Sequence, residues 1–87
     1  MNFDDENYLE NLLKLVCDEK SYLVFLDALA DDFANGGNGW EQGSVDGFLG
    51  AAHAWGNSTS DHPDFDFTKG NPWQRCAWII FAGKFYA

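Results

Sequence analysis

The stretch that decides the fold is Tyr22-Leu23-Val24-Phe25-Leu26-Asp27-Ala28-Leu29-Ala30-Asp31-Asp32-Phe33, residues 22–33. Its apolar residues recur three and four positions apart, which is the period of one face of an α-helix. Asp18 precedes this stretch as a predicted N-cap, because its carboxylate can accept from a free backbone N–H of the first turn. Asn35-Gly36-Gly37 follows it and favours the left-handed backbone that ends helices. The pattern predicts a helix over residues 19–35.

The same period appears in three other parts of the chain. One predicted helix covers residues 5–17, and a second covers residues 45–55, capped by Ser44. A third begins at the cap and first-turn pair Asn71-Pro72 and extends to residue 85. We expect a long polar connection over residues 56–71.

Residues 76–82, inside the last predicted helix, are apolar on all sides. A helix of this kind lies at the centre of a domain or meets a partner. The sequence therefore predicts an all-α fold: one small domain, residues 1–87, of about four helices packed around an apolar C-terminal helix.

The composition is acidic, with a net charge of −9, yet 46% of the residues are hydrophobic and 17% are aromatic. Disordered acidic segments are poor in aromatic residues, so a folded domain is expected. The negative charge disfavours direct binding to nucleic acid and to anionic membrane surfaces. No apolar run is long enough to span a bilayer, and the acidic N-terminus differs from a signal peptide. We expect a cytoplasmic protein whose two cysteines, Cys17 and Cys76, are buried free thiols.

The charge is concentrated in one half of the chain. Residues 1–46 contain 11 acidic and two basic residues, whereas residues 47–87 contain three of each. One interpretation is a solvated face that keeps the protein soluble. The other is a docking surface for a basic partner. The candidate residues for such a surface are Asp27, Asp31, Asp32 and Glu41.

Trp40 lies among glycines directly before Glu41. It is either a lid on the core or an exposed anchor for a partner, since tryptophans are frequent among the residues that dominate binding interfaces. We therefore include it among the partner-binding candidates.

The sequence contains no recognisable catalytic, cofactor-binding or metal-binding motif. Residues 61–66 place oxygen ligands at alternate positions but lack the glycine and the distal glutamate of a calcium-binding EF-hand loop. Phe65 and Phe67 alternate with the acids there, and we expect their rings to attach this segment to the domain. We predict no enzymatic activity, no cofactor and no metal.

Several aromatic motifs in the chain resemble those of a known protein family. They are Phe25-Leu26-x-x-Leu29, then Trp40-Glu41, a Phe48-Leu49 helix that ends at Trp55, and Pro72-Trp73 before an apolar helix that ends in Phe85-Tyr86. Together, over about residues 18–86, they resemble an uncharacterised bacterial family of small acidic helical domains. The chain differs at Ala87, where an acid is expected. The resemblance implies a small helical domain and supplies no catalytic residues.

These observations favour a small acidic protein-binding module whose partner is a basic protein. Its most specific form is an immunity-type or inhibitor protein that neutralises a basic toxin or nuclease. The alternatives are a mimic of nucleic acid that inhibits a DNA- or RNA-binding protein, and a homodimeric structural or accessory subunit that associates through its apolar last helix. The sequence leaves the oligomeric state open.

Overall fold

A computed structural model describes residues 5–36, 40–41 and 43–86 of the chain. Its elements are α1 (Asp5–Leu15), α2 (Glu19–Ala34), α3 (Val45–Thr59), the 3₁₀ helix η1 (Pro63–Thr68) and α4 (Pro72–Ala82). No strand occurs in these described ranges. The prediction of an all-α fold is confirmed, and the described part of the chain forms four α-helices and one 3₁₀ helix.

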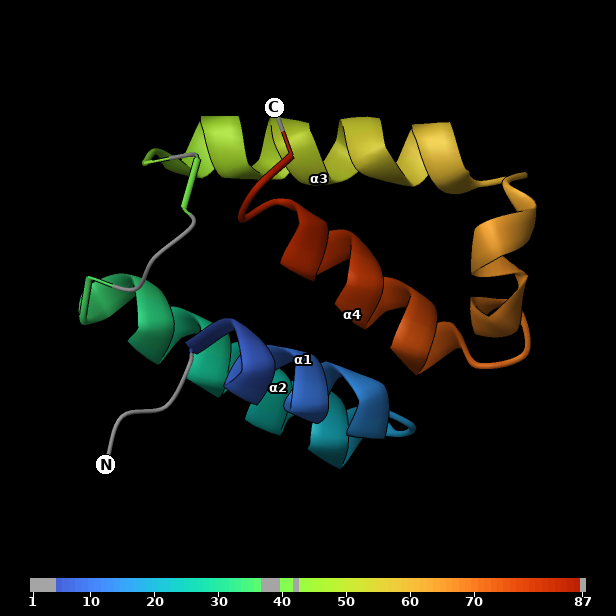
Figure 1. Ribbon diagram of the computed structural model, residues 1–87, viewed down its shortest axis with the longest axis horizontal. Helices are drawn as coiled ribbons and strands as arrows, with labels where there is room; N and C mark the ends of the chain where they lie inside the picture. Colours follow the sequence, from blue (N-terminus) through green and yellow to red (C-terminus); the bar gives the residue numbers. More distant parts are fainter. Residues whose placement is uncertain (1–4, 37–39, 42, 87) are drawn as a thin grey trace.

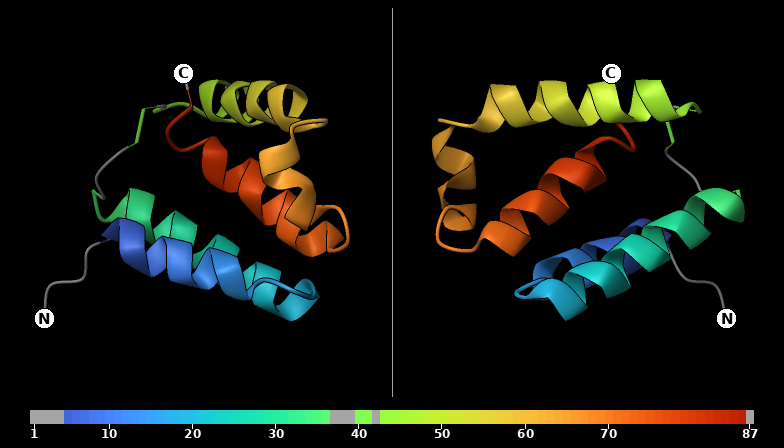
Figure 2. Two further views of the ribbon diagram at one scale, coloured as in Figure 1. Left: turned by 45° about the vertical axis from the view of Figure 1, so that its right-hand side comes forward. Right: turned by 180° about the vertical axis from the view of Figure 1, so that it is seen from behind.

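The helices are arranged with α4 between two other groups (Figure 1). The helices α1 and α2 lie side by side, and α3 lies on the opposite side of the molecule, as the two further views also show (Figure 2). The helix α4 crosses diagonally between them and contacts α1, α2, α3 and η1. The C-terminal end of α2 and the N-terminal end of α3 lie at one end of the molecule, and η1 lies at the other end (Figure 1).

The predicted boundaries of α2 follow from local hydrogen bonds. The Asp18 carboxylate accepts from the backbone N–H of Ser21, at 2.9 Å, and the Ser21 hydroxyl accepts in return from the backbone N–H of Asp18. These hydrogen bonds, first the one from the Ser21 backbone, lower the pKa of Asp18. At the other end Asn35 is the C-cap, and Gly36 has a φ of 73°, the left-handed conformation that suits glycine. Gly37, the last residue of the predicted stop, lies outside the described residues.

The core is formed where α1, α2 and α4 meet. Its buried side chains are all apolar: Leu9, Leu13, Val16, Phe25, Leu29, Ala77 and Phe81. Two polar side chains at the start of α4 form hydrogen bonds with Val16, the residue that follows α1. Gln74 and Asn71 both donate from their side-chain amides to the Val16 carbonyl, at 2.8 and 3.2 Å. These bonds satisfy a carbonyl that α1 leaves free at its C-terminal end.

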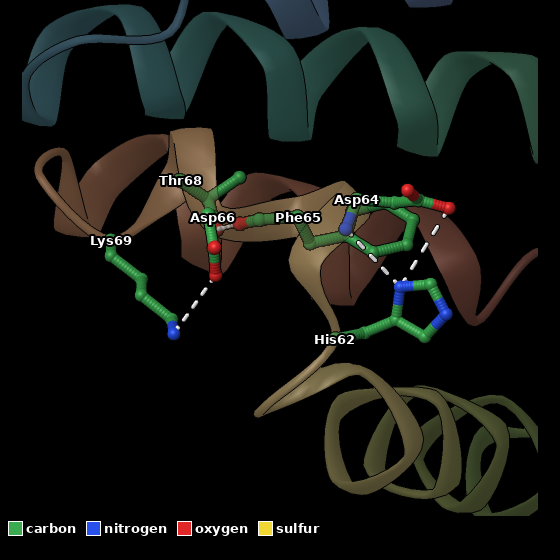
Figure 3. Close-up of polar contacts among 6 residues, drawn as sticks. All are labelled: His62, Asp64, Phe65, Asp66, Thr68 and Lys69. Atoms are coloured by element: carbon green, nitrogen blue, oxygen red, sulfur yellow. Dashed lines mark hydrogen bonds and ion pairs between the residues drawn. The ribbon is translucent and has the colours of Figure 1, made fainter.

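The prediction of a long connection over residues 56–71 is wrong in its extent. The helix α3 continues to Thr59, whose buried hydroxyl donates to the Trp55 carbonyl at 2.9 Å. The next segment forms η1, where the His62 Nδ1 accepts from the backbone N–H of Asp64 at 3.2 Å (Figure 3). Polar side chains favour loops when they can bond to the backbone there. In this segment the side chains of Thr59 and His62 bond to backbone groups of α3 and η1 instead.

The expectation that Phe65 and Phe67 attach this segment is confirmed. The Phe65 ring lies 4.9 Å from Trp55 and 5.8 Å from Trp78, and Phe67 lies 5.8 Å from Trp78, measured between ring centroids. The edge-to-face geometry of these contacts is a favourable arrangement for aromatic rings. Around them, Lys69 pairs with Asp66 at 2.9 Å on the surface (Figure 3).

Two further expectations are wrong. The last helix ends at Ala82 and not near residue 85, because the chain turns there and takes Lys84 into the interior. Both Cys17 and Cys76 are free but exposed. Cys17 lies between α1 and α2, and Cys76 precedes the buried Ala77 on α4, so that its side chain points away from the core.

Candidate functional site

The predicted partner-binding residues lie around the C-terminal end of α2. Asp27 and Asp31 are on α2, four residues apart and both exposed, so they lie on one face one turn from each other. Glu41 is exposed in the α2–α3 connection. None of the ion pairs among the described residues includes these three acids. Their charges face solvent.

Asp32 has a different environment from these three acids. Its carboxylate is only 7% exposed and forms an ion pair with the ammonium of Lys84, which is 2% exposed, at 3.0 Å. The same Asp32 oxygen accepts from the indole N–H of Trp40 at 2.6 Å. The Lys84 ammonium also lies 5.6 Å from the centre of the Trp40 ring, within the range of a cation–π contact. Asp32 is therefore part of the interior, where it cannot act as a surface charge.

This Asp32–Lys84–Trp40 cluster positions Trp40 and Glu41, two described residues between α2 and α3. The backbone N–H of Glu41 donates to the Lys84 carbonyl at 2.7 Å, so the segment after α4 and the connection are joined by the main chain as well. A buried charge pair with additional hydrogen bonds specifies one arrangement of the elements that carry it. The cluster thus holds Trp40 and Glu41 in place beside α2.

Trp40 lies against the core. Its ring is 4.9 Å from Phe33 and 5.8 Å from Phe48, so it joins α2 to α3 through aromatic contacts. It is partly buried, and its indole N–H is used within the molecule. This geometry matches the core-lid interpretation.

An open apolar pocket of about 410 Å³ lies beside these residues. It is bounded by α2, the start of α3 and α4, and its lining residues are almost all apolar: Leu26, Leu29, Ala30, Phe33, Trp40, Gly43, Ser44, Val45, Phe48 and Ile80. Phe33 is 50% exposed and Val45 is 76% exposed, so large apolar side chains on its rim contact water. Ligand pockets in proteins usually measure about 300–1,000 Å³.

The pocket is not among the features predicted from the sequence. The signal available in the sequence was the continuation of the apolar positions Leu26, Ala30 and Phe33 along α2 with helical spacing. In the sequence these positions belong to one apolar stripe together with Phe25 and Leu29. In the structure this stripe has two parts. Phe25 and Leu29 are buried in the core, whereas Ala30 and Phe33 are exposed.

Three titratable groups elsewhere, His53, His62 and Asp46, have local partners. The His53 Nε2 and the Asn57 amide are 3.1 Å apart on α3, and His62 caps η1 and lies 3.7 Å from the Asp64 carboxylate. The Asp46 pKa is lowered, first by a hydrogen bond with the Ser44 side chain. Within the described ranges, no three His, Cys, Asp or Glu side chains are grouped so as to hold a metal ion.

None of the helices described is long and apolar enough to cross a membrane. Comparison with protein-family models, with curated proteins and with solved structures finds no match to this chain. The resemblance to a bacterial family of small acidic domains therefore remains a prediction.

Proposed function

We propose that this protein is a small acidic protein-binding module that binds a basic protein, in the cytoplasm as its sequence predicts. In its most specific form it is an immunity-type or inhibitor protein that neutralises a basic toxin or nuclease. The observation that carries the proposal is the position of Asp31. It lies in the last turn of α2, where the helix dipole disfavours negative charge, and α2 has no basic residue in that turn.

The position of Asp31 is unfavourable for a second reason. Asp27 lies four residues earlier on the same face, and like charges at this spacing destabilise a helix. The neighbouring Asp32 is neutralised by Lys84, whereas Asp31 and Asp27 are exposed and outside every ion pair of the described residues. Charges that destabilise their own helix and remain unpaired are typical of a binding surface, because a cationic partner relieves the repulsion.

The negative potential of Asp27, Asp31 and Glu41 would act mainly on the association rate. Complementary charge steers a partner during diffusion and raises the rate constant by factors of about 10–1,000 at low salt. This effect decreases as the ionic strength rises, because salt screens charges that are more than about 10 Å apart. A salt-dependent association rate is therefore the signature of the proposed function.

The experiment uses affinity capture from the native organism, followed by kinetics with the purified partner. The wild type is compared with a variant that carries Asp27→Asn, Asp31→Asn and Glu41→Gln. The matched control carries Glu19→Gln, Asp61→Asn and Asp64→Asn, which removes the same number of exposed charges. Glu19 begins α2, and Asp61 and Asp64 flank the start of η1, so the control lies at the other end of the molecule (Figure 1).

We expect the first variant to bind the captured partner with an association rate at least about tenfold lower at low salt, and to lose most of the salt dependence. The control should retain both. If the two variants bind equally well, or if the wild-type association rate is independent of salt, the proposal is wrong.

A further inference from the structure

The side of α2 that faces away from the core combines two large apolar side chains with two carboxylates. Leu23 and Val24 are 53% and 51% exposed, and Asp27 and Asp31 are exposed as well. Successive residues of an α-helix are rotated by about 100°, which places all four on one arc of about 100°, with both aspartates between the two apolar side chains. The buried Phe25 lies on the opposite side of the helix. These four residues form the outer α2 face.

We propose that the outer α2 face binds two arginine side chains that the basic partner presents about 6 Å apart, the distance that four residues span along a helix axis. Each guanidinium bonds one of the two carboxylates, and the aliphatic stems of the arginines cover Leu23 and Val24. This inference rests on the proposed function. It adds the chemistry of the partner's contact residues and the apolar part of the surface that receives them.

The charge of the outer α2 face determines the sign of its occupant. None of the ion pairs among the described residues includes Asp27 or Asp31. Lys20, the one base in α2, lies about 10 Å before Asp27 along the helix axis, so it does not pair with either aspartate. A second copy of this chain would bring a net charge of −9 to the same surface, and like charges repel. The face therefore favours a cationic partner over self-association.

The apolar side chains favour arginine over lysine as that cation. A guanidinium is less strongly hydrated than an ammonium and bonds a carboxylate through two parallel N–H groups. The stem of an arginine can also lie along an apolar surface while its charged end remains paired. Leu23 and Val24 provide such a surface directly beside the aspartates. Binding then removes water from apolar area that two carboxylates alone do not have.

The outer α2 face is preformed. Phe25 and Leu29, on the other side of the helix, are only 0% and 4% exposed and attach α2 to the core. The capping box at Asp18 fixes the first turn. The regular helix between these contacts sets the spacing of the two carboxylates, so binding need not order the backbone that carries them.

Synthetic peptides test this inference without a known partner. The probe is a helical peptide of about 18 residues, built from alanine and glutamine, with two arginines at positions i and i+4. One control peptide has lysines at the same two positions. A second keeps the composition but has its arginines at i and i+2, where they point about 200° apart around the helix. Each is titrated into the full ¹⁵N-labelled chain at about 0.05 M salt, where amide chemical shifts locate the site and fluorescence anisotropy gives the Kd.

The key variant combines Leu23→Ala with Val24→Ala, which removes the apolar surface and leaves both carboxylates. The matched control combines Val45→Ala with Leu49→Ala on α3, which lies on the opposite side of the molecule (Figure 1). Leu49 has the same exposed fraction as Leu23, 53%, and Val45 is 76% exposed. Both double variants keep the net charge, and alanine favours the helix in each. Dispersed amide spectra establish that each variant is folded.

We expect the probe to shift the amides of residues 23–31, and each control peptide to bind at least about fivefold more weakly. The Leu23→Ala and Val24→Ala variant should weaken binding of the probe by about fivefold or more. The α3 control variant should leave it unchanged. Combined Asp27→Asn and Asp31→Asn should weaken binding by about tenfold or more and remove most of its salt dependence.

The outcomes separate this inference from the proposed function. If the Leu23→Ala and Val24→Ala variant binds like the wild type while the charge variant loses binding, the inference is wrong and the acidic surface remains. Equal binding of the arginine and lysine probes has the same meaning. If the charge variant binds like the wild type, the proposed electrostatic function fails with the inference. Shifts that map away from α2, or the absence of saturable binding, overturn the inference, and the captured partner then decides the proposed function alone.

Discussion

The loss of the Lys84 charge should cost this protein much of its stability. The ammonium of Lys84 and the carboxylate of Asp32 are 3.0 Å apart and almost fully buried. At that distance their attraction is about 5 kcal/mol with an effective dielectric constant of about 20. When one partner of a buried pair is removed, the other remains as an uncompensated charge, at a cost of about 3–5 kcal/mol. The total stability expected for 87 residues is only about 4–13 kcal/mol.

The measurement is a double-mutant cycle of Lys84→Met and Asp32→Asn, with unfolding in guanidinium chloride followed by far-UV circular dichroism at neutral pH. Asparagine keeps an oxygen that can accept from the Trp40 indole, so Asp32→Asn removes the charge without removing that hydrogen bond. We expect each single variant to lose about 3–5 kcal/mol, and the double variant to lie within about 2 kcal/mol of the wild type, since no unpaired charge then remains.

The reasoning is refuted by either of two results. One is a single variant that loses less than about 1 kcal/mol, the value typical of an exposed pair. The other is a double variant whose loss equals the sum of the two single losses, which would show that the charges do not interact.

Three further outcomes can be measured by equilibrium unfolding. A Cβ added at Gly83 would lie 2.9 Å from the backbone carbonyl oxygen of Phe48, so Gly83→Ala should lose about 1–3 kcal/mol; the control Gly50→Ala, in open space within α3, should gain up to about 1 kcal/mol. The capping hydrogen bonds lower the pKa of Asp18 below 3.8. Their contribution to the stability of the folded protein is therefore complete above that pH and is lost as the pH falls through the lowered pKa. Asp18→Asn, which keeps the cap without a titrating group, should show a smaller decrease in stability over that range than the wild type does. Asp31→Asn should raise the free energy of unfolding by about 0.5–1 kcal/mol, and a gain below the error of the measurement would contradict the dipole argument.

The parts of the fold that the sequence could predict are those set by nearby residues. Asp18 and Asn71 act as N-caps because each bonds a backbone N–H three residues ahead, and such contacts need no knowledge of the rest of the chain. The sequence predicts the C-terminal end of α2 to within one residue for the same reason, since Asn35 and Gly36 act locally. Helix periods and caps are both short-range properties.

The parts that could not be predicted depend on residues far apart in the chain. Nothing near Lys84 in the sequence indicates that its ammonium is buried beside Asp32, because that pairing exists only once α4 has packed against α2. The pocket has the same origin, since Ile80 of α4 and Val45 of α3 complete a wall that begins on α2. The polar residues after Trp55 favour a loop by their sequence, although helical packing buries Thr59. In each case tertiary contacts decide the role of a residue.

The effect of Asp31→Asn on stability and on binding, taken together, distinguishes the two interpretations of the acidic face. A face that serves only solubility has no reason to keep a carboxylate at the end of α2 where the dipole and Asp27 both oppose it. Solubility requires charge, but it does not require charge at that position. A docking surface does require it there, because the partner's cations offset the repulsion on binding. If Asp31→Asn stabilises the free protein and also slows association with the partner, the residue has been retained for binding at the expense of stability, as functional sites commonly are. If it stabilises the free protein and leaves association unchanged, the acidic face acts only as a solvated surface.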